Sequence, residues 1–197
     1  MTIRLSEGTE WKERHMAGTA QSPAEKPKRT GESRVAALFG LKDESWMRHS
    51  NPASVWTRFT VLSLLALSVW SREWVGLLCL IPIGLSLVWM MVNPLLFKEP
   101  RSTRNWASKG VFGERIWSER NEIEIPEEFK SPVPNVANVY AVLGVALLAY
   151  GLVVLDVLMV VAGLVIAHGG KLWYIDRMVL LFERMKERSP TYRAWEY

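Results

Sequence analysis

The sequence predicts an all-α membrane protein: a bundle of four transmembrane helices, arranged as two tight hairpins, with short amphipathic helices at the cytoplasmic interface. Charged and apolar residues are segregated along the chain. Residues 59–97 and 139–175 are almost free of charge, whereas 1–50 and 98–135 are polar and charged. The basic residues and the tryptophans are also unevenly placed. The averages of 49% hydrophobic and 22% charged residues conceal this pattern, because they resemble those of a soluble protein.

The N-terminal segment 1–32 is predicted to be a disordered cytoplasmic tail. It is charged, contains prolines and has few aliphatic residues, so it cannot bury enough apolar surface to fold alone. Residues 33–41 and 43–49 predict two short helices, the second with Asp43 as its N-cap. Because the first residues lack the apolar core of a signal peptide, internal segments are expected to direct insertion, and the membrane domain is expected over 33–188.

The stretch "NPASVWTRF" predicts the start of the first span. Asn51 is suited to cap a helix, and Pro52 is suited to its first position, where no N–H is needed. A helix over 52–70 rises roughly 28 Å, which is close to the thickness of the hydrocarbon core.

A second span is expected over 74–92, after a turn formed by "SRE" at 71–73. Pro82 is expected to kink this helix, because its missing N–H frees the carbonyl four residues earlier. The sequence "NP" at 93–94 is expected to stop it.

The second apolar block, 138–175, is too long for one span of roughly 20 residues. Asp156 lies at its centre. We therefore expect a third span over 138–155 and a fourth over 157–175, with Asp156 in a very tight turn. A cytoplasmic loop over 93–137 would join the two hairpins.

Two amphipathic segments are expected outside the spans. Residues 110–117, "GVFGERIW", predict an interfacial helix that packs under the bundle. Residues 171–188 continue the fourth helix as an amphipathic extension, because apolar residues recur at helical spacing among charges. The pair Gly169–Gly170 is expected to bend this extension onto the membrane surface, and 189–197 would form a C-terminal tail.

Charge and tryptophan placement predict a multi-pass protein of the cell membrane with both termini in the cytoplasm. Of 24 Lys and Arg residues, all except Arg72 fall on one side if there are four spans. Three spans would carry the basic C-terminal segment across, against the preference of positive residues for the cytoplasm. Tryptophans also fall near both expected membrane surfaces, where indole rings are enriched: Trp56, Trp89, Trp173, Trp70 and Trp74.

The bilayer, with its anionic headgroups, is the expected partner of the basic segments. The net charge of +4 comes from residues spread over three polar segments, so nucleic acid is not expected. A protein partner on the cytoplasmic face is a further candidate. The single cysteine, Cys79, lies in an apolar run and is expected to be a small buried side chain.

Three stretches carry a resemblance to a known family: "LFGLKDESWMRHSNPASVWTRF", "WASKGVFGERIW" and "KLWYIDRM". They resemble the motifs of a family of small prokaryotic membrane proteins whose function is not characterised. The similarity covers about 34–188. It implies a membrane location, and it supplies no activity, cofactor or catalytic residue.

Polar residues gather at the expected cytoplasmic mouth of the bundle: His49, Asn51, Arg58, Asn93, Glu114, Arg115, Asp176 and Arg177. Arg58 lies about two turns into the first helix, where a charge is unfavourable unless it reaches the interface or a partner. It can extend to the surface, pair with Glu114 or Asp176, or bind a phosphate or carboxylate of a ligand. If the pairing holds, an ion-pair cluster of Arg58, Glu114, Asp176 and Arg177 is expected.

The sequence favours a non-enzymatic binding or scaffold component that uses this polar face to bind lipid or protein. No hydrolase, zinc-protease or dinucleotide fingerprint is present in the sequence. A small transporter would need polar residues along the spans and an oligomer to form a pore.

The alternative is a membrane enzyme that acts on a lipid or another amphiphile. His49 would then be the acid or base, with Glu114 or Asp176 orienting its imidazole. Arg58 and Arg177 would hold an anionic group, and Arg115 is a further candidate for binding a ligand. No metal site is expected: His49, Glu114 and His168 are suitable ligand types, but His168 is more simply explained as a helix-packing histidine.

Overall fold

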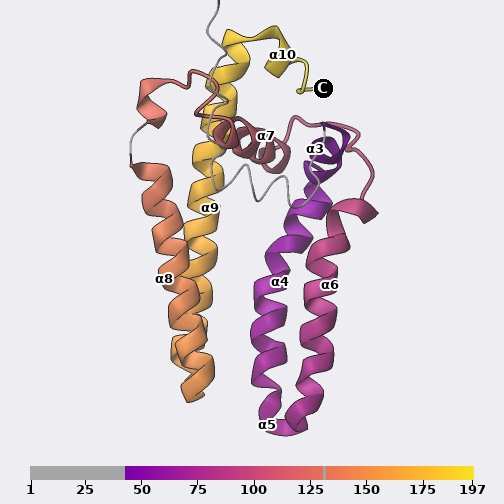
Figure 1. Ribbon diagram of the computed structural model, residues 1–197, viewed down its shortest axis with the longest axis vertical. Coiled ribbons are helices and arrows are strands. Elements are labelled where there is room, and N and C mark those ends of the chain that lie inside the picture. The colour runs from indigo at the N-terminus through magenta and orange to yellow at the C-terminus, as the bar shows by residue number, and fades with distance from the viewer. Residues whose placement is uncertain (1–42, 131) are drawn as a thin grey trace, which may run out of the picture.

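The computed structural model describes residues 43–130 and 132–197, and this part of the chain is all-α, without strands. Figure 1 shows two helical hairpins, α4 with α6 and α8 with α9, and α7 lying across them at one end. The predicted tail over 1–32 and the predicted helix over 33–41 lie outside the described residues. The helices are α3 (Asp43–His49), α4 (Pro52–Trp70), α5 (Arg72–Val75), α6 (Leu80–Leu96), α7 (Trp106–Ser118), α8 (Val133–Val154), α9 (Val157–Arg188) and α10 (Pro190–Arg193), with 3₁₀ turns η1 (Gly76–Cys79) and η2 (Glu127–Phe129).

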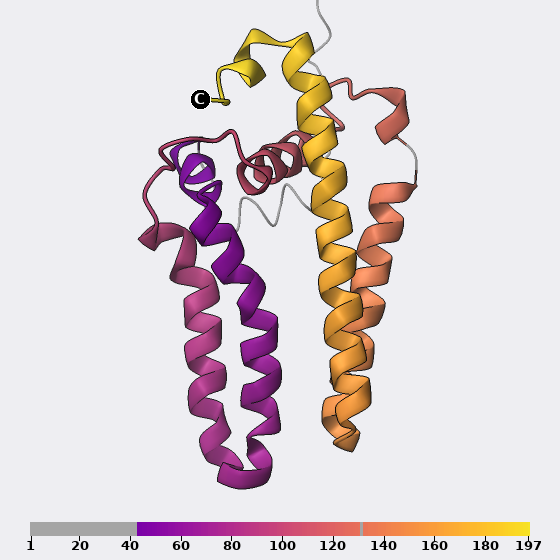
Figure 2. The same cartoon turned by 180° about the vertical axis from the view of Figure 1, so that it is seen from behind.

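Three stretches of the described chain are long and apolar enough to cross a membrane: Pro52–Leu96, Glu127–Val154 and Val157–Arg188. The first of them folds back on itself, so that α4 and α6 run side by side (Figures 1 and 2). Large apolar side chains cover the outside of both hairpins, and Leu77 and Leu158 expose 84% and 78% of their area. Such a surface is typical of contact with lipid. The all-α prediction is therefore confirmed, and the chain has the character of a multi-pass membrane protein.

The start of α4 follows from local capping. The side chain of Asn51 accepts a hydrogen bond from the Ala53 N–H at 2.9 Å, and Pro52 takes the first helical position, as the sequence indicates. The same side chain donates to the carbonyl of Lys98 at 2.8 Å, after the end of α6. The cap therefore also fixes where the two ends of the first hairpin meet.

A buried polar contact joins α4 to α6 near this end. The Ser54 hydroxyl donates to Oδ1 of Asn93 at 2.7 Å, and Nδ2 of Asn93 donates to the Thr57 hydroxyl at 2.8 Å. Asn93 and Ser54 are fully buried. In an apolar interface such bonds hold two helices in register, because unpaired polar groups would be unfavourable there.

The predicted bounds of the second helix are wrong. The turn extends from Ser71 to Cys79, with Gly76 at φ +55°, and α6 begins only at Leu80 and passes through Pro94 to Leu96. Pro82 therefore lies in the first turn of α6, where its missing N–H is tolerated, and does not kink the middle of a helix.

The second hairpin turns at Asp156, as predicted. Leu155 adopts a left-handed conformation (φ 59°), and the Asp156 side chain caps α9 by accepting from the Met159 N–H at 2.9 Å. The helix α8 begins at Val133 and not at 138. Prolines are compatible with the first turn of a helix, so Pro134 extends α8 toward the polar loop.

Small residues bring α8 and α9 into backbone contact. A Cβ on Gly144 would lie 2.3 Å from the Ala167 nitrogen, and one on Gly163 would lie 2.4 Å from the Leu148 nitrogen. A Cβ on Gly170 would meet the Ala141 nitrogen at 2.5 Å. Gly170 thus serves close packing. For this reason the expected bend at Gly169–Gly170 is absent, and α9 runs unbroken to Arg188.

The ends of the hairpins far from α7 are joined by Arg72. Its Nη2 donates to the carbonyls of Leu152 and Val153, at 2.5 and 3.3 Å, in the last turn of α8. A cation is favourable there because the carbonyl end of a helix carries partial negative charge. The one basic residue predicted on that side thus links the two hairpins.

The other end of the molecule is a compact head, formed by α7, η2, the end of α9 from Ile175 onward, and the chain from α10 to Tyr197. Its core holds Phe112, Ile116, Trp117, Ile125, Phe129, Met178, Leu181, Phe182 and Met185. The segment 189–197, expected as a tail, packs back onto this head. The Thr103 hydroxyl donates to the carbonyl of Trp195 at 2.7 Å and accepts from the Tyr197 N–H at 2.9 Å.

Candidate functional site

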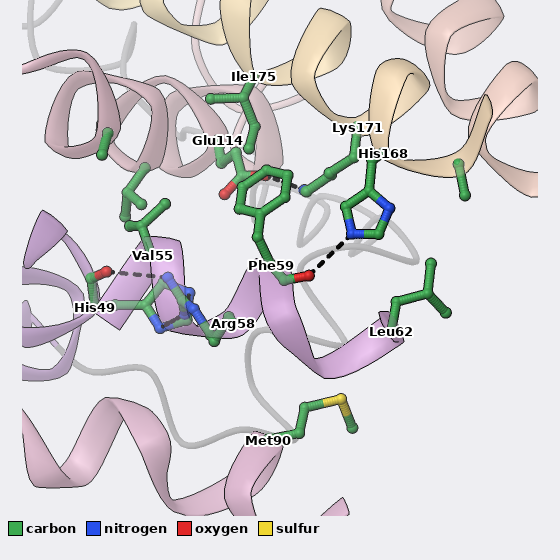
Figure 3. A pocket seen from close by; sticks show the side chains of 13 residues that line it. His49, Val55, Arg58, Phe59, Leu62, Met90, Glu114, His168, Lys171 and Ile175 are labelled. Carbon is green, nitrogen blue, oxygen red and sulfur yellow. Dashed lines mark hydrogen bonds and ion pairs between the residues drawn. The ribbon is translucent and has the colours of Figure 1, made fainter. Parts of the chain in front are cut away.

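A cavity of about 330 Å³ lies between the two hairpins, beside α7. Its walls come from α3, α4, α6, α7 and α9, and Figure 3 shows the side chains that line it. We call the part lined by His49, Arg58, Glu114 and Lys171 its polar end, and most of the other lining side chains are apolar. The lining residues are His49, Val55, Arg58, Phe59, Leu62, Met90, Ala107, Val111, Glu114, Ala167, His168, Lys171 and Ile175.

Arg58 supplies positive charge to the polar end. Its Nη1 contacts the imidazole nitrogens of His49, and its Nη2 donates to the His49 carbonyl at 3.2 Å. Among the side chains that the structure describes, those of residues 46–130 and 132–197, no carboxylate lies at ion-pair distance from this guanidinium. The side chain is partly buried, and among the described residues its charge is compensated by the dipole of the His49 carbonyl and by the more distant Glu114.

Glu114 of α7 and Lys171 of α9 form an ion pair at the same end of the cavity. The Lys171 Nζ lies 2.6 Å from Oε1 of Glu114, with 21% of the Glu114 side chain and 47% of the Lys171 side chain exposed. Burial alone would raise the pKa of Glu114, but the ammonium of Lys171 and the charge of Arg58 outweigh it, so the pKa lies below the ordinary value. The carboxylate is therefore ionised at neutral pH.

His49 is held as a neutral imidazole. Burial, and secondarily the neighbouring charge of Arg58, lower the pKa of His49 from 6.5 to about 3. A neutral ring fits its contact with a guanidinium, because an imidazolium there would meet a like charge.

We expect this histidine to make the fold sensitive to mild acid. The unfolded chain binds a proton near pH 6.5 and the folded chain does not, so stability is complete above that pH and falls as the pH drops toward 3. Between pH 8 and pH 5 the loss should be about 2 kcal/mol. Thermal melting of the purified protein across this range, compared with His49→Gln, measures it. In His49→Gln the melting temperature should fall less steeply with decreasing pH. An equal dependence on pH in both proteins would contradict the lowered pKa of His49.

His168 bridges the two hairpins at the wall of the cavity. Its Nδ1 lies 2.8 Å from the carbonyl of Leu164, and its Nε2 lies 2.9 Å from the carbonyl of Phe59 on α4 (Figure 3). Both ring nitrogens are thus engaged by backbone, which agrees with the predicted packing role. Among the residues that the structure describes, no group of three His, Cys, Asp or Glu side chains is placed to hold a metal ion.

The predicted ion-pair cluster does not form, because Asp176 and Arg177 do not line this cavity. Asp176 pairs with its neighbour Arg177 at 3.0 Å and accepts a long bond, 3.5 Å, from the indole of Trp106. Arg177 lines a separate cavity of about 270 Å³ beside the start of α8. Successive residues of a helix point about 100° apart, so Asp176 and Arg177 turn away from the face that presents Lys171 and Ile175.

Arg115 is likewise directed elsewhere. Its guanidinium lies over the ring of Trp195, 4.5 Å from the centroid, and 3.8 Å from Glu119. The structure therefore brings together His49, Arg58 and Glu114 from the sequence-predicted set. It adds Lys171, which the sequence reasoning missed as a site residue. The spacing of 168, 171 and 175 along one helical face is the signal that would have found it.

Comparison with known proteins gives a family and no function. A family model described as a family of unknown function (DUF6653) matches residues 30–195. Searches of curated proteins and of solved structures returned no match to this chain.

Proposed function

This chain belongs to the DUF6653 family, and we propose that it is a four-span membrane protein that binds an anionic amphiphile in the cavity between its hairpins. The observation that carries this proposal is the guanidinium of Arg58. Among the described side chains it has no carboxylate at ion-pair distance, and it lies at the polar end of a cavity whose remaining walls are largely apolar. Binding, and not a chemical step, is the proposed role.

The four spans would be α4, α6, α8 and α9. Each is at least 17 residues long, and α4 and α6 pair as a hairpin within one continuous apolar stretch. The two turns, at α5 and at Asp156, lie at the end opposite to α7 and the C-terminus (Figure 2). Because the basic residues of the described chain, apart from Arg72, belong to the other end, the head and both termini are proposed to face the cytoplasm of the cell.

The charges around the cavity favour an anion. Arg58 and Lys171 contribute two positive charges, Glu114 contributes one negative charge, and His49 is neutral. An anionic group beside Arg58 would balance the remaining charge, and charge-assisted hydrogen bonds to a guanidinium are strong in a partly buried site. Apolar walls next to this charge suit a ligand that carries an alkyl chain.

The protonation of His49 argues against the alternative of a membrane enzyme. A pKa of about 3 makes the imidazole a poor base at neutral pH, because a general base works best when its pKa is close to the working pH. Glu114 is engaged by Lys171, and Asp176 pairs with Arg177 away from the cavity. The polar outer face of the head is the proposed surface for a protein partner.

Replacement of Arg58 tests the proposal. The purified protein is mixed with oleate or with the uncharged monoolein, and bound ligand is counted by native mass spectrometry. We expect oleate to bind, monoolein to bind much more weakly, and Arg58→Gln to reduce oleate affinity by about tenfold or more. Arg48→Gln, at an exposed site outside the cavity, is the matched control and should bind as the parent does. If oleate and monoolein bind equally well, and if Arg58→Gln does not change the affinity for oleate, the proposal is overturned.

A further inference from the structure

We infer that the ligand has a single alkyl chain, with a carboxylate or phosphate-monoester headgroup held by Arg58 and Lys171, and that the chain leaves the cavity sideways into the bilayer. This inference rests on the proposed function and specifies its ligand. Three features support this inference: the volume of the cavity, the order of the residues that line it, and the few contacts between the hairpins.

The cavity is too small for a complete two-chain lipid. Its volume of about 330 Å³ is near the lower end of the roughly 300–1,000 Å³ that encloses drug-sized ligands. A headgroup and the first part of one chain are compatible with this space. A second chain beside the first would compete for space with the contact between α4 and α9, where Nε2 of His168 lies 2.9 Å from the carbonyl of Phe59.

The lining residues change from charged to apolar along one direction. Arg58 and Leu62 are four residues apart on α4, so they share a face, and Leu62 lies about 6 Å farther from the head. Met90 of α6 and Ala167 of α9 line the cavity beside Leu62. A headgroup at Arg58 therefore places its first methylene groups against Leu62 and Met90, where 40% of Met90 is exposed.

The polar end is built for an anion without an attached ammonium group. The planar guanidinium of Arg58 matches carboxylate and phosphate oxygens, and the flexible stem of Lys171 lets its ammonium reach the same group. Glu114 is the one carboxylate among the lining residues, and it is already paired with Lys171 at 2.6 Å. Among the described lining residues, a choline or ethanolamine headgroup would find no free carboxylate for its positive charge.

The few contacts between the two hairpins support the proposed route by which the alkyl chain leaves the cavity. In the described chain α6 packs on α4 and α3 and makes no extensive contact with α8 or α9. Away from the head, α4 meets α8 and α9 chiefly through one apolar cluster, which contains Ala66, Leu148, Leu152 and Val160. A chain that starts at Arg58 can thus continue between the hairpins into lipid.

A set of ligands that differ in chain number and length tests this inference. Binding of oleate, 1-oleoyl lysophosphatidic acid, dioleoyl phosphatidic acid and hexanoate is measured by native mass spectrometry for the full-length protein. The first two ligands separate a carboxylate from a phosphate source of the charge. Leu62→Trp fills the apolar end without removing a charge, and Leu64→Trp, at a site 44% exposed on the same helix, is the matched control.

We expect at least one single-chain ligand to bind about tenfold more tightly than dioleoyl phosphatidic acid. Leu62→Trp should weaken binding of that long-chain ligand by a similar factor, whereas Leu64→Trp should leave its affinity unchanged. Equal binding of the two-chain lipid, unaffected by Leu62→Trp but lost in Arg58→Gln, would refute the single chain and keep the proposed function. Binding of hexanoate or inorganic phosphate as tight as that of oleate would refute both.

Discussion

Gly113→Val is expected to detach α7 from α9 and to unfold the head. A Cβ at Gly113 would lie 1.9 Å from the carbonyl oxygen of Met178 and 2.4 Å from its carbonyl carbon. These are backbone atoms in the middle of a long helix, so they cannot move aside as a flexible side chain would. The two helices must separate, and Met178, which is fully buried, would be exposed. We expect a loss of at least about 3 kcal/mol, above the usual range for overpacking.

Thermal unfolding of the purified protein, followed by circular dichroism, measures this loss. Gly169→Ala is the matched control, because Gly169 is also helical and a Cβ there meets nothing within 4 Å. The control should be neutral or more stable by about 0.5–1 kcal/mol, since alanine favours a helix. If Gly113→Val and the parent protein have the same melting temperature, α7 does not dock on α9 in this way.

Phe182→Ala is expected to destabilise the head by about 3–5 kcal/mol. Phe182 is fully buried, and its ring lies 5.3 Å from that of Phe112, so truncation removes an aromatic contact and leaves a cavity between α7 and α9. The loss of stability is expected in the head, while the exposed apolar surfaces of the hairpins stay unchanged.

The comparison with Leu180→Ala makes this result specific. Leu180 is on the same helix but 41% exposed, so its truncation should change the free energy of unfolding by less than about 1 kcal/mol. Urea or thermal unfolding in a mild detergent gives both values. If the two variants lose the same stability, the head is not organised around the core that contains Phe182.

Local signals explain what the sequence predicted well. The cap of Asn51 and Pro52 and the turn at Asp156 depend on side chains that bond to backbone two or three residues away, and such patterns are readable without the fold. The start of α6 was misplaced, because the hydrophobic pattern of 74–80 suits a helix, while Gly76 and Pro82 together extend the turn.

Contacts between distant segments explain what the sequence could not predict. Gly170 looked like a hinge, and its packing against Ala141 depends on the register of two helices. The segment 189–197 looked like a tail because Thr103, which binds it, lies far away in the chain.

Only part of the candidate site could be predicted from the sequence, and the reason is geometric. Arg58, His49 and Glu114 were expected at one end of the bundle, and all three line the cavity. Asp176 was expected beside them because its position along the axis of α9 brings it to the same end of the bundle. The position of a residue along a helix axis is easier to predict from sequence than its rotation about that axis, and the rotation decides whether Asp176 or Lys171 faces the cavity.

Labelling of single cysteines from each side of the membrane tests the central claim, that two hairpins cross the bilayer and hold the head on one face. In a Cys79→Ser background, Glu73→Cys places a thiol in the first turn and Glu122→Cys places one in the head, and both sites are exposed. A membrane-impermeant maleimide is applied to right-side-out and to inside-out vesicles. We predict that the thiol at 73 reacts only in right-side-out vesicles and the thiol at 122 only in inside-out vesicles. Labelling of both positions from the same side would contradict the two-hairpin topology.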